Sequence, residues 1–535
     1  MGGKAGNKMS FKKIICVIAA LAVTCSVFSG CNKNTAVDTQ SSSEPKGEIS
    51  YPIETDVTLK YWVRLSPALG TSVKNFGETE FAKEYMKRTG INVAYQHPAQ
   101  GQDNEVLNLL IASGDLPDII ESDWLARDPD ASIAKNTILS LNDYFKDYSP
   151  NLMKYLSENP DVDTAIRTDT GNYYVYPFIR GDEKLLSTAG LMLRNDWLSD
   201  LGLSVPETIS EWEAVLEAFK SKCTTPLAMA NGHLYSFLGA YGLGIEFFIE
   251  NDKIMFGATD DKFKDFLAKT NEWYKKGYID KNFAILDGKI INANMLDGKS
   301  GVTFGAGGGG IGTYLNAMKD KDPKYDLVAA PFPVLEKGQR PKFGNKQLKY
   351  SPLNGAAITG KSKNRELAAR FLDYSYSEEG YTLNNFGVEG ISYEMKDNYP
   401  TYKDVITNNP NGLAMSMALP IYVRAANEGP FVQDKRYIEQ YYQLDQQKNA
   451  LEVWSQNDHD KHLIPQITLT QAETSEFSKI MSEIRTYRDE TIINFILGTK
   501  PIDEFSEYVE KVKSLKLDRA IEIEQASYDR YLNRK

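Results

Sequence analysis

The feature that most constrains this fold is an alternation of strand and helix patterns that begins at residue 57. Residues 57–63 carry apolar side chains at every second position, which is typical of a strand. A helical pattern at 81–90 follows, and strands are predicted at 91–95 and 117–120 on either side of a helix that ends at Gly114. This β-α-β-α-β order favours a parallel sheet, which binds ligands at the carboxyl ends of its strands.

The pattern restarts near residue 191, which predicts a second unit of strands and helices. Residues 191–193 form an apolar strand, and Thr208–Glu211 is a capping box that precedes an amphipathic helix. Further strands are predicted at 302–304 and 327–330, and helical spacing prevails beyond residue 477. The predicted fold class is therefore α/β with a helical C-terminal extension.

A short apolar run near the N-terminus predicts an exported protein. A cluster of lysines precedes the apolar residues 14–28, which are fewer than the roughly 20 that a membrane-spanning helix needs. We therefore interpret residues 1–30 as a signal peptide. The polar residues from 32 onward predict a flexible tether that ends near residue 54.

Charge and aromatic content narrow the class of partner. The net charge of -11 argues against a broad nucleic-acid surface, which needs basic side chains to displace counterions. Aromatic residues make up 11% of the chain, more than a core alone requires, and flat rings suit flat apolar ligand faces. We therefore expect no nucleic-acid partner.

The sequence contains no recognisable catalytic constellation. The chain has 4 histidines, of which His459 and His462 have a spacing that metal sites use. Their polar surroundings favour a solvated loop, and the 72 carboxylates offer no way to select a catalytic pair. We therefore expect no enzyme activity, no cofactor and no metal site.

The glycine-rich segment 305–310 matches the G-x-G-x-x-G pattern of dinucleotide sites and follows a predicted strand. The acidic residue expected after the next strand is missing, because Asp326 precedes that strand. We therefore favour another interpretation, in which Gly307 and its neighbours allow the backbone to approach a ligand closely.

Five segments together resemble the extracellular solute-binding proteins of carbohydrate ABC importers, the family 1 group that contains maltose-binding protein. In chain order they are residues 59–62, 111–120, 194–208, the glycine-rich strand end after Phe304, and 362–372. Each segment alone is weak, whereas their order and spacing are specific. A helical tail that includes Phe505–Tyr508 and Tyr528–Tyr531 resembles the long lipoprotein branch of this family.

The end of the apolar run, residues 27–31, is similar to a bacterial lipobox, although Phe28 stands where leucine is usual. This similarity implies that Cys31 is lipidated and becomes the first mature residue. Cys223 would then be the only free thiol, so no intramolecular disulfide is expected.

The resemblance implies two α/β lobes joined by a hinge, a type II periplasmic-binding-protein-like fold with the ligand held between the lobes. We expect residues 55–186 and 352–398 in lobe 1, and 187–351 and 399–535 in lobe 2. The chain would cross between lobes more than once, and closure would use contacts that form only when both lobes touch the ligand.

The resemblance also implies a function. We expect a monomeric, lipid-anchored protein on the extracellular face of a bacterial membrane that captures an oligosaccharide and passes it to the permease subunits of an ABC importer. One alternative is a surface-tethered polysaccharide hydrolase or lyase. Another is the same fold with a peptide or other solute as ligand.

A saccharide site needs aromatic platforms and planar side chains that make two hydrogen bonds. We favour Trp124 as the aromatic platform and Asp123 as the hydrogen-bond acceptor. The alternative for Trp124 is a structural role, in which its ring caps the sheet. If Trp124 is the platform, Trp124→Ala should weaken ligand binding by about 1–3 kcal/mol. Arg194 is a candidate donor, or it pairs with Asp196 instead. The other candidates are Trp62, Ser122, Tyr176, Arg180, Gly307, Asn354, Glu389 and Tyr393.

Overall fold

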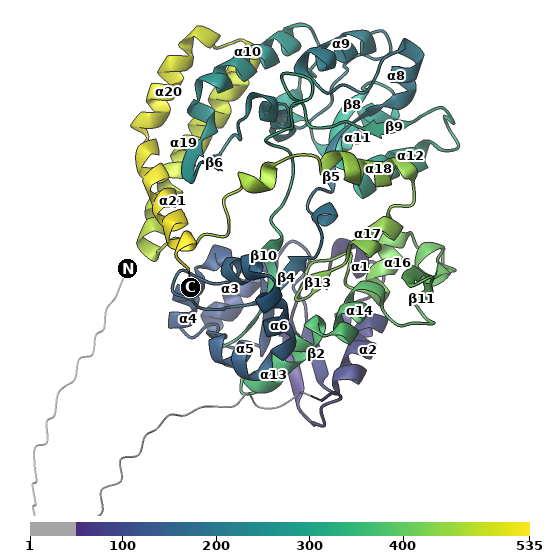
Figure 1. Cartoon of the computed structure of the whole chain (residues 1–535), viewed down its shortest axis with the longest axis vertical. Coiled ribbons are helices and arrows are strands. Elements are labelled where there is room, and N and C mark those ends of the chain that lie inside the picture. Colours follow the sequence, from purple (N-terminus) through teal and green to yellow (C-terminus); the bar gives the residue numbers. More distant parts are fainter. Residues whose placement is uncertain (1–49, 535) are drawn as a thin grey trace, which may run out of the picture. The chain divides into compact units, whose positions relative to one another are not determined.

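The computed structural model describes residues 50–534, without the side chains of 352–354. The predicted signal peptide, Cys31 and most of the predicted tether lie outside the described residues. Within the described residues the chain builds two separate main sheets, each with its own hydrophobic core (Figure 1).

The first sheet has six strands in the order β13-β4-β10-β3-β1-β2. Strand β1 is parallel to β2 and β3, which confirms the predicted β-α-β-α-β unit, whereas β10 is antiparallel to β3 and β4. The strand bounds are β1 (Thr58–Trp62), β2 (Asn92–Gln96), β3 (Ile119–Ser122), β4 (Tyr176–Arg180), β10 (Tyr350–Ile358) and β13 (Val432–Gln433).

Helices from the same segments accompany this sheet, and several of them share its core, which includes Phe81, Phe145 and Phe371. Helix α2 begins at Thr79, whose side chain accepts a hydrogen bond from the Ala82 amide, and ends at the left-handed Gly90. The helices are α1 (Pro67–Gly70), α2 (Glu80–Thr89), α3 (Asp103–Ser113), α4 (Pro129–Ala134), α5 (Asn142–Tyr148), α6 (Pro150–Glu158), α7 (Pro160–Ala165), α13 (Arg365–Asp373), α14 (Glu378–Phe386), α15 (Asp404–Thr407), α16 (Met415–Tyr422) and α17 (Lys435–Tyr441).

The second sheet is antiparallel in the order β8-β5-β9, and the hairpins β6–β7 and β11–β12 stand apart from both main sheets. The predicted capping box is confirmed, because the Thr208 and Glu211 side chains each bond the other's backbone amide at the start of α9. The strands are β5 (Ala189–Arg194), β6 (Phe247–Glu250), β7 (Lys253–Phe256), β8 (Val302–Ala306), β9 (Leu327–Ala329), β11 (Tyr393–Lys396) and β12 (Tyr399–Tyr402). The helices are α8 (Asn195–Leu201), α9 (Ile209–Phe219), α10 (Asp261–Lys275), α11 (Gly288–Leu296), α12 (Thr313–Met318) and α18 (Asp445–Trp454).

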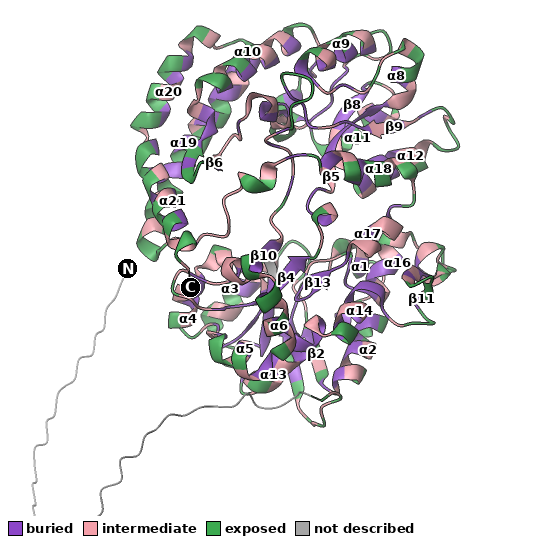
Figure 2. Ribbon diagram, in the orientation of Figure 1, coloured by how far each residue is buried: buried purple, intermediate pink, exposed green. Residues whose placement is uncertain are grey.

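A helical C-terminal extension is present, as predicted, and packs on the second core. It consists of α19 (Gln471–Leu497), α20 (Phe505–Ser514) and α21 (Leu517–Leu532). Phe495, Phe505 and Tyr508 join the same cluster as Phe263 of α10, while α20 keeps an exposed outer face (Figure 2).

The segment that contains α16 and β13 differs from the expected lobe assignment, which placed all of 399–535 in lobe 2, because α16 contacts α1 and α2 of the first lobe. Strand β13 also belongs to the first lobe. It pairs in parallel with β4 of the first sheet, through bonds such as Gly181 N–H to the Gln433 carbonyl at 3.0 Å. The backbone groups at this edge of β4 need hydrogen-bond partners, which β13 supplies. The sequence did not predict β13, because a strand of two residues is too short to show a periodic pattern. The other lobe boundaries stay a prediction.

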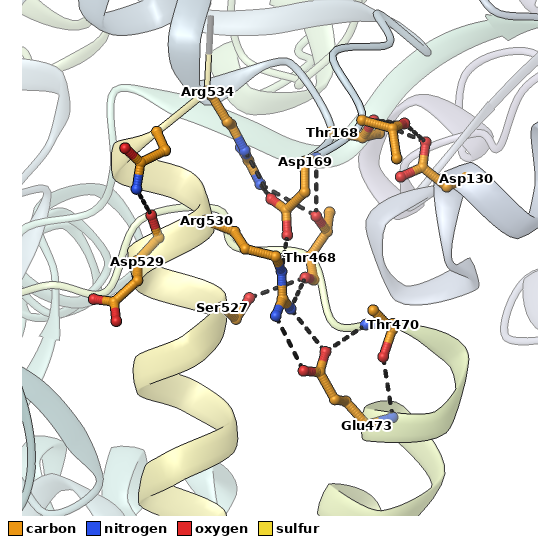
Figure 3. Close-up of polar contacts among 12 residues, drawn as sticks. Asp130, Thr168, Asp169, Thr468, Thr470, Glu473, Ser527, Asp529, Arg530 and Arg534 are labelled. Atoms are coloured by element: carbon orange, nitrogen blue, oxygen red, sulfur yellow. Dashed lines mark hydrogen bonds and ion pairs between the residues drawn. The ribbon is translucent and has the colours of Figure 1, made fainter.

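Helix α21 is bonded to the chain of the first lobe through Asp169, in the loop between α7 and β4 (Figure 3). Arg530 Nε and an Arg534 terminal nitrogen each lie 2.7 Å from an oxygen of Asp169. Arg530 also donates to both oxygens of Glu473 in α19, at 3.0 and 2.7 Å. Because Asp169 and Arg534 are largely buried, this network ties the helical extension to the first lobe.

We expect Asp169→Asn to lower the free energy of unfolding by about 2–3 kcal/mol, because it leaves the buried Arg534 guanidinium without its carboxylate and removes one of the two carboxylates that Arg530 contacts. Urea denaturation followed by tryptophan fluorescence measures the change. Asp529→Asn is the control, since Asp529 is exposed on the same helix and should change stability by less than about 0.5 kcal/mol. Equal stabilities for both variants would contradict a stabilising role for the network.

Candidate ligand-binding site

The carboxyl ends of β1 and β3 open into a cavity of about 520 Å³, which we call cavity A. Residues 63–67 line it directly after β1, and Glu121 contributes from β3. The far wall comes from the loop 424–428, which returns from α16. A ligand cavity at this edge is what a parallel β-α-β-α-β unit predicts.

A buried ion pair forms the polar wall of cavity A. Arg424 is 7% exposed and donates to Glu121 Oε1 at 2.7 Å and to the Glu428 carbonyl at 2.9 Å. The other Glu121 oxygen accepts from the Tyr61 hydroxyl at 2.7 Å. Burial alone would lower the pKa of Arg424, but the Glu121 carboxylate raises this pKa above its usual value, so the guanidinium stays charged.

A second cavity of about 530 Å³, cavity B, shares Glu428 with cavity A. Arg180, at the end of β4, is 8% exposed and donates to Glu428 Oε1 at 2.9 Å and to the Leu348 carbonyl at 3.0 Å. Asp123 and Gln466 also line this cavity, and Asp123 accepts a hydrogen bond from the Ala126 amide at 3.1 Å. Cavities A and B therefore meet at one carboxylate.

A third cavity of about 330 Å³, cavity C, is lined from the second lobe and is rich in rings. The rings of His233 and Phe304 are stacked with centroids 4.5 Å apart. Burial lowers the pKa of His233, and it lowers that of His459 to about 4, so both rings are neutral at pH 7. The ring-bearing lining residues are His233, Tyr235, Phe247, Phe248, Phe304, Phe343, His459 and His462.

One carboxylate, Glu246, lines cavity C and is held by two arginines of α19. Arg485 donates to it at 2.9 Å, and Arg488 also contacts it. Burial raises the pKa of Glu246, but the two guanidinium groups outweigh burial and hold the pKa below its usual value. Among the described residues, no group of three or more His, Cys, Asp or Glu side chains is arranged to hold a metal ion.

Asp123 and Arg180 are the predicted site residues that the structure brings together, because both line cavity B. Ser122 is half-buried at the last position of β3. Asn354 lies in β10 without a described side chain. His459 and His462 lie beside Phe343 in cavity C, so the expected solvated loop is wrong for these two rings.

The favoured role of Trp124 is not supported by its position. Trp124 is 0% exposed, lies with Trp62 in one buried cluster, and donates its ring N–H to the Ile120 carbonyl at 3.2 Å. Neither ring offers a face to a ligand in this conformation. The alternative, a tryptophan that caps the sheet, describes Trp124 better.

Four other candidates have packing partners of their own. The Arg194 guanidinium lies 4.4 Å from the Trp197 ring centroid and 4.1 Å from that of Tyr325, and it pairs with Asp196 as the alternative proposed. Tyr176 is buried and its hydroxyl is hydrogen-bonded to Ser149, and the Tyr442 ring covers Gly307. Tyr393 packs on Phe386, and Glu389 is exposed.

Sequence reasoning missed Arg424, Glu428 and Gln466, because isolated polar residues in loops carry no motif. It also missed the aromatic wall of cavity C. The signal available there was the density of rings between residues 233 and 248, which exceeds what one helical face needs.

The chain belongs to the bacterial extracellular solute-binding protein family, because the model of that family matches residues 75–382. The two-lobed α/β fold that the resemblance implied is therefore confirmed. Within residues 50–534, no helix combines the length and apolar character needed to cross a membrane.

Three relatives illustrate the similarity. The fructooligosaccharide ABC transporter substrate-binding protein FusA of Streptococcus pneumoniae is 27% identical over 98% of this chain and 99% of its own length. Its structure with kestose has a TM-score of 0.69, covers 90% of this chain and all of its own, and is 25% identical. Lipoprotein LipO of Bacillus subtilis is 25% identical over 75% of this chain and 79% of its own length.

The alginate-binding protein AlgQ2 without calcium ion superimposes with a TM-score of 0.70, covering 90% of this chain and 100% of its own. Its identity is 23%, so this likeness supports the fold.

We expect Trp124→Ala to lower the free energy of unfolding by about 3–5 kcal/mol, because it empties a fully buried ring site. Chemical denaturation measures this, and Trp124→Phe, which keeps most of the buried ring volume, should cost less. A Trp124→Ala protein with unchanged stability and lost ligand binding would restore Trp124 as a stacking platform.

Glu524 of α21 makes stability depend on pH. Burial raises the pKa of Glu524 to about 7, Arg485 opposes this effect and Glu246 adds to it. The native state then keeps a proton that the unfolded state releases near pH 4.5, so the contribution of Glu524 to stability is largest below pH 4.5 and is lost as pH rises through about 7. The loss attributable to this group is on the order of 3 kcal/mol.

Glu524→Gln should flatten this part of the stability profile and raise stability at pH 8, as measured by urea denaturation at several pH values. Glu522→Gln, an exposed neighbour on α21, is the control and should keep the wild-type slope. A wild-type slope in Glu524→Gln would show that other groups cause the pH dependence.

Proposed function

We propose that this protein captures an oligosaccharide in cavities A, B and C and delivers it to an ABC importer. The observation that carries the proposal is the combination of planar hydrogen-bonding groups in cavities A and B with the aromatic wall of cavity C. Sugar hydroxyls suit the planar groups, and the apolar C–H faces of sugar rings suit the aromatic wall.

The similarity to FusA over nearly the full length of both chains supports this proposal. Delivery implies permease subunits in the membrane as partners, and we propose that the protein acts as a monomer. We further propose that Cys31 carries a lipid anchor at the extracellular membrane face, a proposal to which the 25% identity with lipoprotein LipO lends support.

The relatives named above are binding proteins or a lipoprotein by name, which favours capture over catalysis. The alternative of a tethered hydrolase or lyase predicts shortened products. The alternative of a peptide or other solute predicts that no saccharide binds at all. Both can be separated from the main proposal in one binding assay.

Isothermal titration calorimetry of the lipid-free protein with an oligosaccharide panel tests the function. We expect saturable heat with at least one sugar and recovery of that sugar unchanged by mass spectrometry. Shortened chains would favour the hydrolase or lyase. Binding that appears only with peptides would replace the sugar with another solute.

Gln466→Ala should weaken binding of that sugar by about fivefold to tenfold, because one neutral hydrogen bond contributes about 1 kcal/mol. Gln339→Ala is the matched control, since Gln339 is exposed and lines none of the three cavities. Equal losses in both variants would argue against cavity B as part of the site.

A further inference from the structure

Two of the three arginines that line the three cavities, Arg180 and Arg424, are already paired with carboxylates of this chain. The cationic lining residues are Arg64, Arg180 and Arg424. The acidic lining residues are Asp103, Glu121, Asp123, Glu246 and Glu428. The described walls therefore carry more negative than positive groups before any ligand enters.

The pairing of the two buried arginines is specific. Arg180 uses one terminal nitrogen for Glu428 and the other for the Leu348 carbonyl. Arg424 bonds Glu121 and the Glu428 carbonyl through one nitrogen, while its buried Nε has no partner among the described residues. That Nε is itself buried, and a two-bond fork with a ligand carboxylate would need the terminal nitrogen that Glu121 and the Glu428 carbonyl already occupy.

The other walls offer an acidic ligand little compensation. Cavity C contains Glu246, whose charge Arg485 and Arg488 already balance, together with the neutral His233 and His459. Arg64 is exposed and shares cavity A with Asp103. A ligand carboxylate in cavity B would lie with Asp123 and Glu428, and like charges in a partly desolvated cavity repel strongly.

We propose that this site, if the proposed sugar-binding function is right, selects neutral oligosaccharides and rejects those built from uronates. The carboxylates of Asp123 and Glu428 accept hydrogen bonds from sugar hydroxyls, and the arginines hold those carboxylates in place. The protein's net charge of -11 acts in the same direction, because it repels an anionic chain at long range.

Two panels matched in length test this selectivity by calorimetry at one ionic strength. The neutral panel contains fructo-, malto-, xylo- and cello-oligosaccharides, and the acidic panel contains oligogalacturonates and oligoalginates. We expect at least one neutral sugar to bind more than tenfold tighter than every acidic one.

An acidic oligomer that binds as tightly as the best neutral sugar would overturn the selectivity and leave the sugar-binding function standing. If neither panel binds, the proposed function fails and the selectivity fails with it. The two failures are therefore distinguishable in the same experiment.

Glu428→Gln tests the cause, because it removes the charge that neutralises Arg180 while keeping the size of the side chain. We expect the ratio of acidic to neutral affinity to rise at least fivefold. Asp123→Asn should shift the ratio in the same direction, and it provides a second measurement if Glu428→Gln does not fold.

Glu452→Gln is the control, since Glu452 is exposed, pairs with Lys184 and lines none of the three cavities. Its affinity ratio should match the wild type. Unchanged ratios in both cavity variants would show that the carboxylates do not set the selectivity.

Discussion

The ion pair between Arg424 and Glu121 joins the two parts of the chain on which the first-lobe cavities depend. Glu121 belongs to β3, and Arg424 begins the loop that returns from α16, 303 residues further along the chain. Both side chains are buried, so each charge needs the other to offset its lost hydration. The loop that carries Glu428 into cavities A and B is therefore held against the edge of the sheet.

This arrangement explains how the two buried arginines of the polar walls stay charged, because each one pairs with a carboxylate of the same walls. Glu428 pairs with Arg180 at the end of β4, and its backbone carbonyl accepts from Arg424. The carboxylates thus keep fixed orientations, and a ligand meets oriented acceptors in place of free charges. The aromatic cavity C supplies the apolar complement from the second lobe.

The helical extension contributes to both lobes. Its α19 and α20 complete the second core, and Arg485 and Arg488 of α19 hold Glu246 at cavity C. Arg530 and Arg534 near the C-terminus contact Asp169 of the first-lobe chain. The extension is therefore part of the framework around cavity C.

Periodicity and spacing in the sequence by themselves determined the β-α-β-α-β unit, the capping box at Thr208 and the helical C-terminal extension, and the resemblance of five segments in order indicated the family. These features depend on neighbours close in the chain, or on segment order. Asp123 was predictable because strand ends lie at a known edge of a parallel sheet, whereas Arg180 was expected from the family resemblance, which places the ligand near the first crossing between lobes. Only the tertiary structure decided that Trp124 and Arg194 are buried and that Arg424 pairs with Glu121. Trp124 packs in one cluster with Ala357, Arg194 lies against Tyr325, and Arg424 and Glu121 are 303 residues apart, so no local pattern in the sequence reports these contacts.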